Sequence, residues 1–433
     1  MKKPGRTFIK TFNKKTVWQY TVLASVFVLA ATASHEASAT DGYFSNGYGV
    51  KSQGIGGIGI ALPQDALAAA SNPAGTARVG NRLDVGVSLF RPQRGAEISG
   101  SPVPGANGKY EGNDTSTFII PDFGYTQQLS DKSAYGVAVY GNGGMNTDYK
   151  RNPYAAFGSA GKAGVNLEQL FVTPSYAYKL DDNNAIGVGL NLAYQRFQAK
   201  GLSAFAGSSS SPANLTNRGV DTATGAGLRL GWTGDISDDI TLGATWASRI
   251  QTSGFDKYKG LFAEKGGFDI PGNYGAGIAW RATPALTLAS DYQRILYSQV
   301  DSVGQPLSNL FAGNPLGSKH GPGFGWEDIN VYKIGASYAL NDSVTLRTGY
   351  THSDQPVPKD QTFFNILAPG VVQEHYTVGA TWKIGEGELS AAYVHAPQKT
   401  VHGRNSIPAP FGGGEADVHL EEDILGVSYA LKL

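Results

Sequence analysis

The sequence predicts an all-β protein, a transmembrane antiparallel β-barrel of about 14 strands plugged by an N-terminal hatch. Fourteen strand-like segments run from Arg82 to the C-terminus, and the gaps between them alternate strictly between long and short. Tight turns at one rim and extended loops at the other are typical of such a barrel. The long gaps are 93–114, 143–166, 200–221, 252–271, 298–328, 353–372 and 398–420, and the short gaps are 130–131, 181–183, 235–238, 283–284, 341–342 and 384–386.

The clearest segments alternate between two kinds of face. In Ala185–Phe197, one face carries Ile186, Val188, Leu190, Leu192 and Tyr194, and the other carries Gly187, Gly189, Asn191 and Gln195. A soluble sandwich also alternates, but its apolar set points inward. Glycine and small polar residues on the second face are typical of a watery lumen, which leaves the apolar face for lipid.

Two strand-like segments contain a proline. Pro121 lies in Thr115–Leu129, and Pro174 lies in Leu167–Leu180. Proline has no N–H to donate to a neighbouring strand. We therefore expect a bulge or a local break in pairing at each of them.

The composition excludes several classes of protein. The 433 residues carry a formal net charge of zero, and only 16% are charged. This balance gives no electrostatic reason to expect nucleic acid as a partner. The chain has no cysteine, which excludes thiolate metal sites and thiol nucleophiles. We expect no cofactor and no metal ion.

Residues 1–39 are predicted to form a cleaved signal peptide. A basic leader precedes an apolar run from Val17 to Ala33, and Ala37-Ser38-Ala39 offers a small-x-small cleavage site. An uncleaved anchor helix is the alternative, although the run is short for a stable span. No other segment offers ~18 consecutive apolar residues. We therefore expect a multi-pass β-barrel in a Gram-negative outer membrane.

Residues 40–81 are the candidate hatch, and residues 82–433 are the candidate barrel. More than about eight strands leave a lumen that wall side chains do not fill. Within the hatch, Gly54-Ile55-Gly56-Gly57-Ile58-Gly59 matches G-x-G-x-x-G, but no βαβ unit surrounds it. We interpret this stretch as a flexible segment in a confined lumen rather than a nucleotide site.

Two motifs carry a family resemblance. Asp65–Gly75 contains the tripeptide Asn72-Pro73-Ala74, and Asp354-Gln355-Pro356-Val357-Pro358 follows a late strand. Together with the fourteen segments, they resemble the FadL/TodX family of outer-membrane transporters for long-chain fatty acids and aromatic hydrocarbons. That family carries Asn-Pro-Ala in its hatch and Ser-Pro-Val-Pro after a late strand. The resemblance extends from about Asp41 to the C-terminus.

The resemblance implies passive transport of hydrophobic molecules. In that family the substrate lands in an apolar groove between the third and fourth extracellular loops, moves to an inner pocket, and leaves sideways through a gap at a kinked third strand. The corresponding loops here are 200–221 and 252–271. Apolar residues on loops that otherwise face water indicate a binding groove, and the alternative is a small core that holds the loops together. The candidate groove residues are Leu202, Phe205, Leu215, Phe255, Leu261, Phe262 and Phe268.

The third strand, Lys132–Asn142, runs into Gly141-Asn142-Gly143-Gly144. Glycine tolerates bulges and weakens pairing, so Gly141, Gly143 and Gly144 are the predicted kink of a lateral gate. An ordinary glycine-rich loop entrance is the alternative.

A fatty carboxylate in a low-dielectric pocket would need a cation, and five charged residues have lumen parity. They are Arg229, Arg249, Asp291, Lys333 and Arg347, of which Arg229 and Arg347 are candidate ligand contacts. The resemblance adds Arg196, although Arg196 shares the parity of Tyr194 toward lipid. Which of these residues touch a substrate is left open.

No nucleophile-elbow serine accompanies the histidines, which we interpret as exposed loop residues, so the protein is predicted not to be an enzyme. The alternative function is a general porin or an adhesin-type barrel with loop-based binding. The expected partners are a hydrophobic small molecule, outer-membrane lipid and lipopolysaccharide, and the barrel-assembly machinery. The sequence leaves open the oligomeric state and the choice between a fatty acid and an uncharged hydrocarbon.

Overall fold

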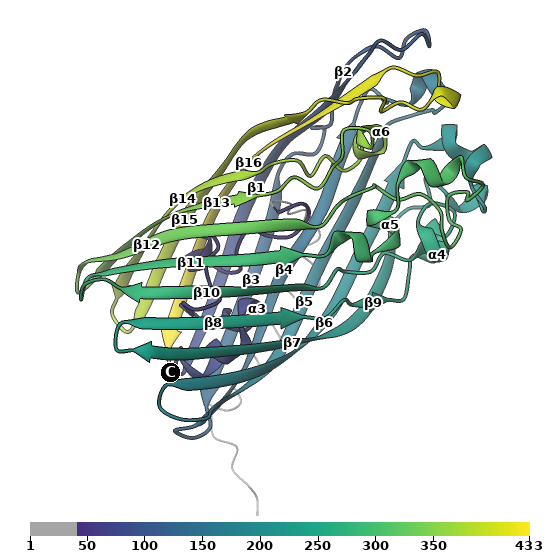
Figure 1. Ribbon diagram of the computed structural model, residues 1–433. Coiled ribbons are helices and arrows are strands. Elements are labelled where there is room, and N and C mark those ends of the chain that lie inside the picture. Colours follow the sequence, from purple (N-terminus) through teal and green to yellow (C-terminus); the bar gives the residue numbers. More distant parts are fainter. Residues whose placement is uncertain (1–40) are drawn as a thin grey trace, which may run out of the picture. The chain divides into compact units, whose positions relative to one another are not determined.

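The computed structural model describes residues 41–433, so the predicted signal peptide and its cleavage site lie outside the described part of the chain. One antiparallel sheet forms the wall of a barrel (Figure 1). It closes on itself because β1 (Arg82–Ser99) pairs on one side with β3 (Phe118–Gln128) and on the other with the last strand, β16 (Glu415–Lys432).

Fourteen strands form this wall in the described residues, as predicted. Between β3 and β16 they are β4 (Ser133–Tyr149), β5 (Ala163–Lys179), β6 (Asn184–Lys200), β7 (Asp221–Ser237), β8 (Ile240–Ala247), β10 (Asn273–Arg281), β11 (Leu286–Ile295), β12 (Ile329–Asn341), β13 (Val344–Ser353), β14 (Glu374–Ile384) and β15 (Gly387–Val401). The short strands β2 (Gly108–Glu111) and β9 (Gln251–Thr252) pair with β1 and β7 in the loop region.

The helices are single turns in the N-terminal segment and in the long loops. The α-helices are α2 (Val50–Gln53), α3 (Ala68–Ser71), α4 (Ala263–Gly266), α5 (Asp301–Gly304) and α6 (Thr362–Asn365). The 3-10 turns are η1 (Pro73–Ala77), η2 (Ala155–Phe157), η3 (Ser203–Ser208), η4 (Pro212–Asn214), η5 (Asp256–Tyr258), η6 (Tyr297–Gln299), η7 (Leu307–Leu310) and η8 (Ala409–Phe411). None of the helices among residues 41–433 has the length and apolarity needed to cross a membrane.

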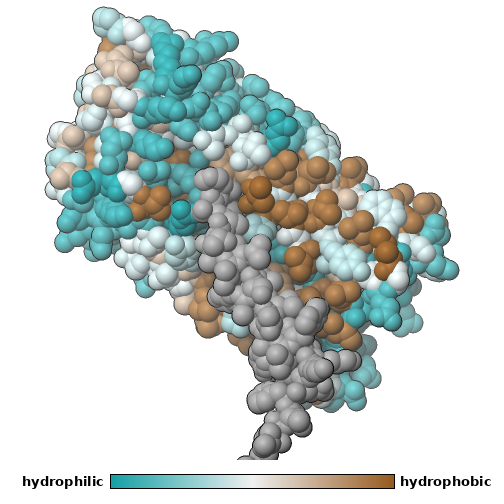
Figure 2. All heavy atoms as spheres, turned by 180° about the vertical axis from the view of Figure 1, so that it is seen from behind, coloured by the Kyte–Doolittle hydropathy of each residue, from teal (hydrophilic) through white to brown (hydrophobic). Residues whose placement is uncertain are grey.

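The two faces of the wall differ as the alternation predicts. On β6, Ile186 and Leu192 are 43% and 42% exposed, whereas Asn191 and Gln195 are at most 1% exposed. The apolar set therefore points away from the barrel axis, which excludes the soluble sandwich. Figure 2 shows hydrophobic side chains gathered over the wall, away from the hydrophilic loop end.

The prolines interrupt pairing as expected. Around Pro174, the register between β5 and β6 passes from Val172–Leu192 directly to Ser175–Gly189 without a shift. Pro121 pairs with Val87 of β1, and it lies in the part of β3 that does not pair with β4. A residue with one neighbouring strand can be proline at little cost, because no second neighbour needs its N–H.

The N-terminal segment, residues 41–81, is enclosed by the wall and bonds to strands around most of its circumference. Asp84 accepts from Ala66 N at 3.0 Å, and Asp291 accepts from Gly59 N and Ile60 N at 2.8 and 3.0 Å. The side chain of Lys333 donates to the Asn46 and Gly57 carbonyls. Buried backbone groups of the segment thus find their partners on the wall.

Glycines on the inner face of the wall make room for this segment. A Cβ on Gly243 would lie 2.4 Å from Ile60 O, and one on Gly349 would lie 2.3 Å from Gly56 N. The stretch Gly54–Gly59, which we interpreted as flexible, instead packs closely on β12, β13 and β14. Its Gly56 donates to Thr377 Oγ1 at 2.8 Å, so close backbone approach explains its glycines.

Candidate functional site

The predicted loop residues come together in one buried cluster. Leu202, Phe205, Leu261 and Phe262 line a cavity of about 20 Å³, with Leu316, Phe324 and Phe364 from later loops. We call this the loop cavity. Leu215, Phe255 and Phe268 are buried in the same hydrophobic cluster. All seven predicted residues are at most 8% exposed, so they form the closed interior of the loops rather than an open groove.

Two later loops, which the sequence did not point to, also contribute to the loop cavity. The segments around Phe324 and Phe364 complete the loop cavity, and the ring of Phe364 lies 5.1 Å from that of Phe205, edge to face. The signal that could have found them is the same one that found Phe205, an aromatic residue in a long loop. The resemblance directed attention to two loops, although four contribute.

The N-terminal end, defined as Asp41–Asn46, lies under these loops. Tyr43 is fully buried, and its ring centroid lies 5.1 to 6.2 Å from those of Phe268, Tyr297 and Trp326. The Tyr297 hydroxyl donates to Asp41 O at 2.5 Å and accepts from Tyr43 N at 3.1 Å. The N-terminal end is therefore held by aromatic packing and by the Tyr297 hydroxyl, and the Lys333 ammonium lies 3.8 Å from its Asp41 carboxylate.

Two acidic residues of the segment titrate unusually. Burial raises the pKa of Asp41 to about 6, against the opposing effect of Lys333. Burial and the neighbouring Asp84 raise the pKa of Asp65 to about 6, against the effects of Lys51 and Arg82. Both carboxyls therefore lose their protons on passing from mildly acidic to neutral pH.

The predicted kink coincides with a bulge. The register of β4 on β5 shifts between Gly141 and Gly143, and Asn142 is the extra residue. The backbone here bonds to the N-terminal end, because Gly144 N donates to Tyr43 O at 3.0 Å and Ser45 N donates to Asn142 O at 2.9 Å. Gly143 must lack a side chain, since a Cβ would lie 1.7 Å from Tyr43 O.

Strands β3 and β4 separate from each other beside this bulge. Pairing of β3 with β4 runs from Gln128–Ala134 to Phe123–Val139. Beyond Phe123, residues 118–122 pair with β1, and β4 from Tyr140 onward pairs with β5. Contact between the neighbours resumes where Asp148 N donates to Gly112 O at 3.0 Å. We call the bounded gap between residues 118–122 and 140–145 the β3–β4 window.

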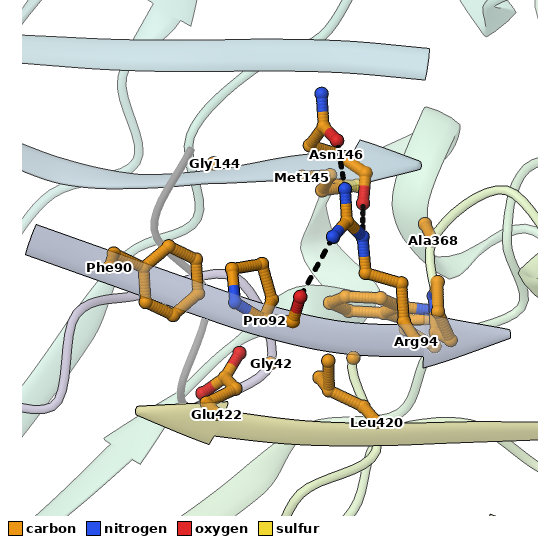
Figure 3. A pocket seen from close by; sticks show the side chains of 13 residues that line it. Gly42, Phe90, Pro92, Arg94, Gly144, Met145, Asn146, Ala368, Leu420 and Glu422 are labelled. Atoms are coloured by element: carbon orange, nitrogen blue, oxygen red, sulfur yellow. Dashed lines mark hydrogen bonds between the residues drawn. The ribbon is translucent and has the colours of Figure 1, made fainter. Parts of the chain in front are cut away.

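A second cavity, here the wall cavity, lies between β1, β4 and β16 beside the window (Figure 3). Phe90, Met145, Trp326 and Leu420 give it an apolar lining, and Gly42 of the N-terminal end also lines it. Its two charged residues, which no sequence pattern indicated, are Arg94 and Glu422, each 1% exposed.

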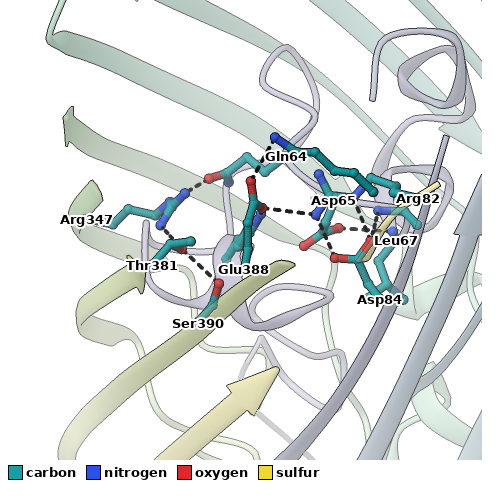
Figure 4. A network of polar contacts seen from close by, with 12 residues as sticks. Gln64, Asp65, Leu67, Arg82, Asp84, Arg347, Thr381, Glu388 and Ser390 are labelled. Atoms are coloured by element: carbon teal, nitrogen blue, oxygen red, sulfur yellow. Dashed lines mark hydrogen bonds and ion pairs between the residues drawn. The ribbon is translucent and has the colours of Figure 1, made fainter. Parts of the chain in front are cut away.

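The predicted cations are occupied by protein partners. Arg347 donates to Gln64 and Thr381, which joins the N-terminal segment to β13 and β14 (Figure 4). Arg229 donates to Ser71 O at 3.2 Å. Their lumen parity is as predicted, but their partners are the N-terminal segment and the wall.

Arg249 and Arg196 are paired with carboxylates. Arg249 lies 2.8 Å from Asp269, and Arg196 lies 2.9 Å from Glu168. Arg196 has the same parity as Tyr194, which is 41% exposed, so it points away from the lumen and from both cavities. The structure therefore gives no support to the ligand contact that the resemblance suggested for Arg196.

The motif Asn72-Pro73-Ala74 fixes the middle of the N-terminal segment. The Asn72 amide donates to Ile60 O at 2.8 Å and to Trp232 O at 2.9 Å, and its oxygen accepts from Ala74 N at 3.1 Å. It thus ties two parts of the segment to each other and to β7. Pro73 and Ala74 press on Gly187 of β6.

The histidines do not assemble an active site in the described residues. His375 on β14 corrects the expectation of exposed loop histidines, since it is fully buried. His395, Glu421 and Asp423 bring potential metal ligands within 4.8 Å of one another, and His395 already pairs with Asp423 at 3.0 Å.

The comparisons with known proteins agree with this architecture. The family described as outer membrane protein transport protein (OMPP1/FadL/TodX) matches residues 36–432, so the chain belongs to that family. It is an outer-membrane transport protein and not an enzyme, as predicted.

Individual relatives are distant but cover nearly the whole chain. The long-chain fatty acid transport protein of Escherichia coli (strain K12) is 23% identical over 430 residues, covering 88% of this chain and 93% of the relative. Among solved structures, a Pseudomonas aeruginosa FadL homologue has a TM-score of 0.69 at 17% identity, covering 90% of this chain and 99% of that one. The Pseudomonas putida toluene transporter TodX has a TM-score of 0.65 at 16% identity, with the same coverage. These two structures support the fold alone.

Proposed function

We propose that this protein carries hydrophobic molecules, fatty acids or aromatic or aliphatic hydrocarbons, passively across the outer membrane. The observation that supports this most is the position of the N-terminal end. It packs against Phe268 of the loop cluster, bonds to the bulge of β4, and supplies Gly42 to the wall cavity. One short segment thus separates the loop cavity, the wall cavity and the β3–β4 window.

The first step is capture under the extracellular loops. A hydrophobic molecule that enters the loop cavity replaces aromatic contacts with contacts of the same kind, so little free energy is lost when the loops open around it. The lining of Leu202, Phe205, Leu261 and Phe262 suits an apolar ligand of either class.

The second step is displacement of the N-terminal end. A hydrophobic ligand can replace its aromatic contacts, and the polar contacts that must break are those with Gly144, Asn142, Tyr297 and Lys333. Movement of this end opens a route to the wall cavity and the bulge. The rest of the segment, which we propose acts as the hatch, stays bonded to the wall and closes the lumen to water.

The third step is lateral release through the β3–β4 window into the membrane. The unpaired edges of β3 and β4 lie beside the bulge, and Pro121 removes one donor that would otherwise close them. A hydrophobic molecule gains free energy by entering lipid, so transport down its gradient needs no energy source. The apolar outer wall then faces outer-membrane lipid and lipopolysaccharide, and insertion of such a barrel uses the barrel-assembly machinery.

A general porin is the rival function. A porin needs a continuous aqueous path, whereas residues 41–81 bond to strands from β1 to β15 inside this barrel. Single-channel recording separates the two functions. We expect no large steady conductance. A large open pore would refute both the proposal that residues 41–81 act as a hatch and the proposal of lateral release.

Capture is tested by charging the loop cavity. The double variant Phe205→Asp/Phe262→Asp should reduce uptake of a radiolabelled hydrophobe at least tenfold while the barrel still assembles, because two buried carboxylates oppose both loop closure and ligand entry. Phe311→Asp is the matched control, since Phe311 is a loop aromatic that is 46% exposed. Unchanged uptake in the double variant would reject the loop step.

Release is tested by closing the window with a disulfide. The chain has no cysteine, so the pair Asp122→Cys/Tyr140→Cys is the only thiol pair present. These positions follow Phe123–Val139 in register, and their oxidation extends pairing into the window. Uptake should fall on oxidation and return on reduction. The control pair, Gln127→Cys/Tyr135→Cys, lies where the strands already pair, and its oxidation should leave uptake unchanged.

A further inference from the structure

The wall cavity contains a buried carboxyl group that the transport path does not explain. Glu422 is 1% exposed, and neither of its side-chain oxygens has a hydrogen-bond partner in the described residues. Its side chain extends from β16 toward Pro92 and lines the cavity (Figure 3). A buried carboxyl without partners is costly, so a site that retains one has a use for it.

The neighbouring cation cannot supply that partner. Arg94 donates all five of its N–H groups to other oxygens. They are the carbonyls of Pro92, Thr115 and Asn146 and the side-chain oxygens of Asn113 and Asn146. A guanidinium has five such donors and no acceptor. The wall cavity therefore contains a positive charge with no free donor and a carboxyl group whose two oxygens both lack partners in the described residues.

This pair of residues selects among polar groups on a ligand. A ligand carboxylate finds no free N–H on Arg94 and would be repelled by an ionised Glu422, so it could pair only with a protonated Glu422. An ammonium would lie beside the Arg94 charge. A hydroxyl has neither conflict, and because it both donates and accepts, it bonds to Glu422 whether that group is ionised or protonated.

The rest of the cavity suits a molecule that is otherwise apolar. Phe90, Met145, Trp326 and Leu420 surround the two charged residues. The volume is about 30 Å³, which corresponds to one or two water-sized groups. The cavity as it stands therefore fits a head group, and the flexible Met145 side chain is the part of the lining best able to move for the attached body.

We infer that the wall cavity binds the hydroxyl group of a hydrophobic alcohol or phenol, with Glu422 as the acceptor. This inference rests on the proposed function and refines it, since it assigns a preferred substrate class to the inner site. Glu422 is a specificity residue here, and Arg94 shapes the site while its own donors stay bonded to β1, β4 and the loop that leads to β3.

The test uses three probes that differ in one group: propylbenzene, 4-propylphenol and 4-propylbenzoate. Binding to the purified full-length protein is followed by tryptophan fluorescence, to which Trp326 in the cavity lining contributes, and is checked by calorimetry. We expect 4-propylphenol to bind about fivefold to tenfold more tightly than propylbenzene, because a typical hydrogen bond strengthens binding by about this factor.

The variant Glu422→Met should remove the preference for the phenol and leave propylbenzene binding intact. Glu421→Met is the matched control, because Glu421 is the adjacent carboxyl with outward parity and should keep the preference. Equal binding of phenol and hydrocarbon by the wild type would overturn the inference, with Glu422 then bonded only to water. Preference for the benzoate would overturn it as well. In both cases hydrophobe uptake continues, whereas absence of uptake for all three probes would refute the proposed function itself.

Discussion

The two parts of the N-terminal segment are held by different forces. From Gly54 to Asn81, the segment is fixed by polar bonds to many strands and by glycines that let backbones touch. The N-terminal end, Asp41–Asn46, packs on aromatic rings, and its fewer polar contacts come from the Tyr297 hydroxyl, from Lys333 and from the backbone of the β4 bulge. Polar anchors can be replaced only by groups of matching geometry, but ring contacts can be replaced by any apolar molecule. The difference suggests one part that stays and one part that moves.

The largest effect is expected from Asn72→Ala, which attacks the fixed part. The Ile60 and Trp232 carbonyls would lose their buried donor, at a cost of about 2–5 kcal/mol. We expect the segment to leave the wall and long-lived conductance steps to appear in planar bilayers. Asn309→Ala, a loop substitution, is the control. Silent bilayers with normal protein stability would show that this anchor is dispensable.

A smaller effect is expected from Gly187→Ala. The added methyl would lie 2.3 Å from Ala74 N, a backbone atom that cannot move as a flexible side chain can. Overpacking of this kind typically costs about 1–3 kcal/mol. The thermal midpoint should fall, as measured by heat-dependent gel mobility. Gly207→Ala has open space around its methyl and should leave the midpoint unchanged.

In the N-terminal end, the variant Tyr297→Phe should change hydrogen exchange locally. This variant removes the bonds to Asp41 O and Tyr43 N, worth about 1–2 kcal/mol, and retains the ring. Hydrogen exchange should accelerate at residues 41–46 and stay slow from Gly54 onward, without new conductance. Tyr332→Phe on the exposed outer wall is the control. Acceleration along the whole segment would contradict the division into two parts.

The smallest effect is a pH dependence of the same end. Burial raises the pKa of Asp41 from 3.8 to about 6, so the buried form binds more protons than the released form between these values. Attachment of the N-terminal end should therefore weaken as pH rises from about 4 to 6 and remain weaker at pH 7, by roughly 1 kcal/mol or more. Exchange rates at residues 41–46 measure this change. Asp41→Asn should flatten the profile.

The barrel could be predicted from sequence because strand periodicity and turn chemistry are local. The outward face of Ala185–Phe197 could be predicted from the alternation of apolar and polar residues alone. The loop residues such as Phe205 and Phe262 were found because the family resemblance pointed to their two loops and because apolar side chains on loops that face water indicate a binding site. Their burial was not evident, since the later loops that cover them contribute through tertiary packing.

The inner sites depend on distant pairing. Arg94 and Glu422 meet because β1 and β16 close the barrel, and no local pattern links residues so far apart. Parity placed Arg229 and Arg347 inside correctly, but their partners follow from the path of the N-terminal segment. The inner glycines were interpreted as lining for water, whereas they accommodate that segment.

The closure of the barrel has a mechanical consequence. The seam between the first and last strands is paired along all of β1, from Arg82 to Ser99, whereas the seam of β3 and β4 is paired only from Gln128 to Phe123. Under lateral tension, the wall should open inside the chain rather than where its two ends meet. The fold thus determines where the wall is weakest. That place is the β3–β4 seam, two strands away from the extensively paired β1–β16 seam.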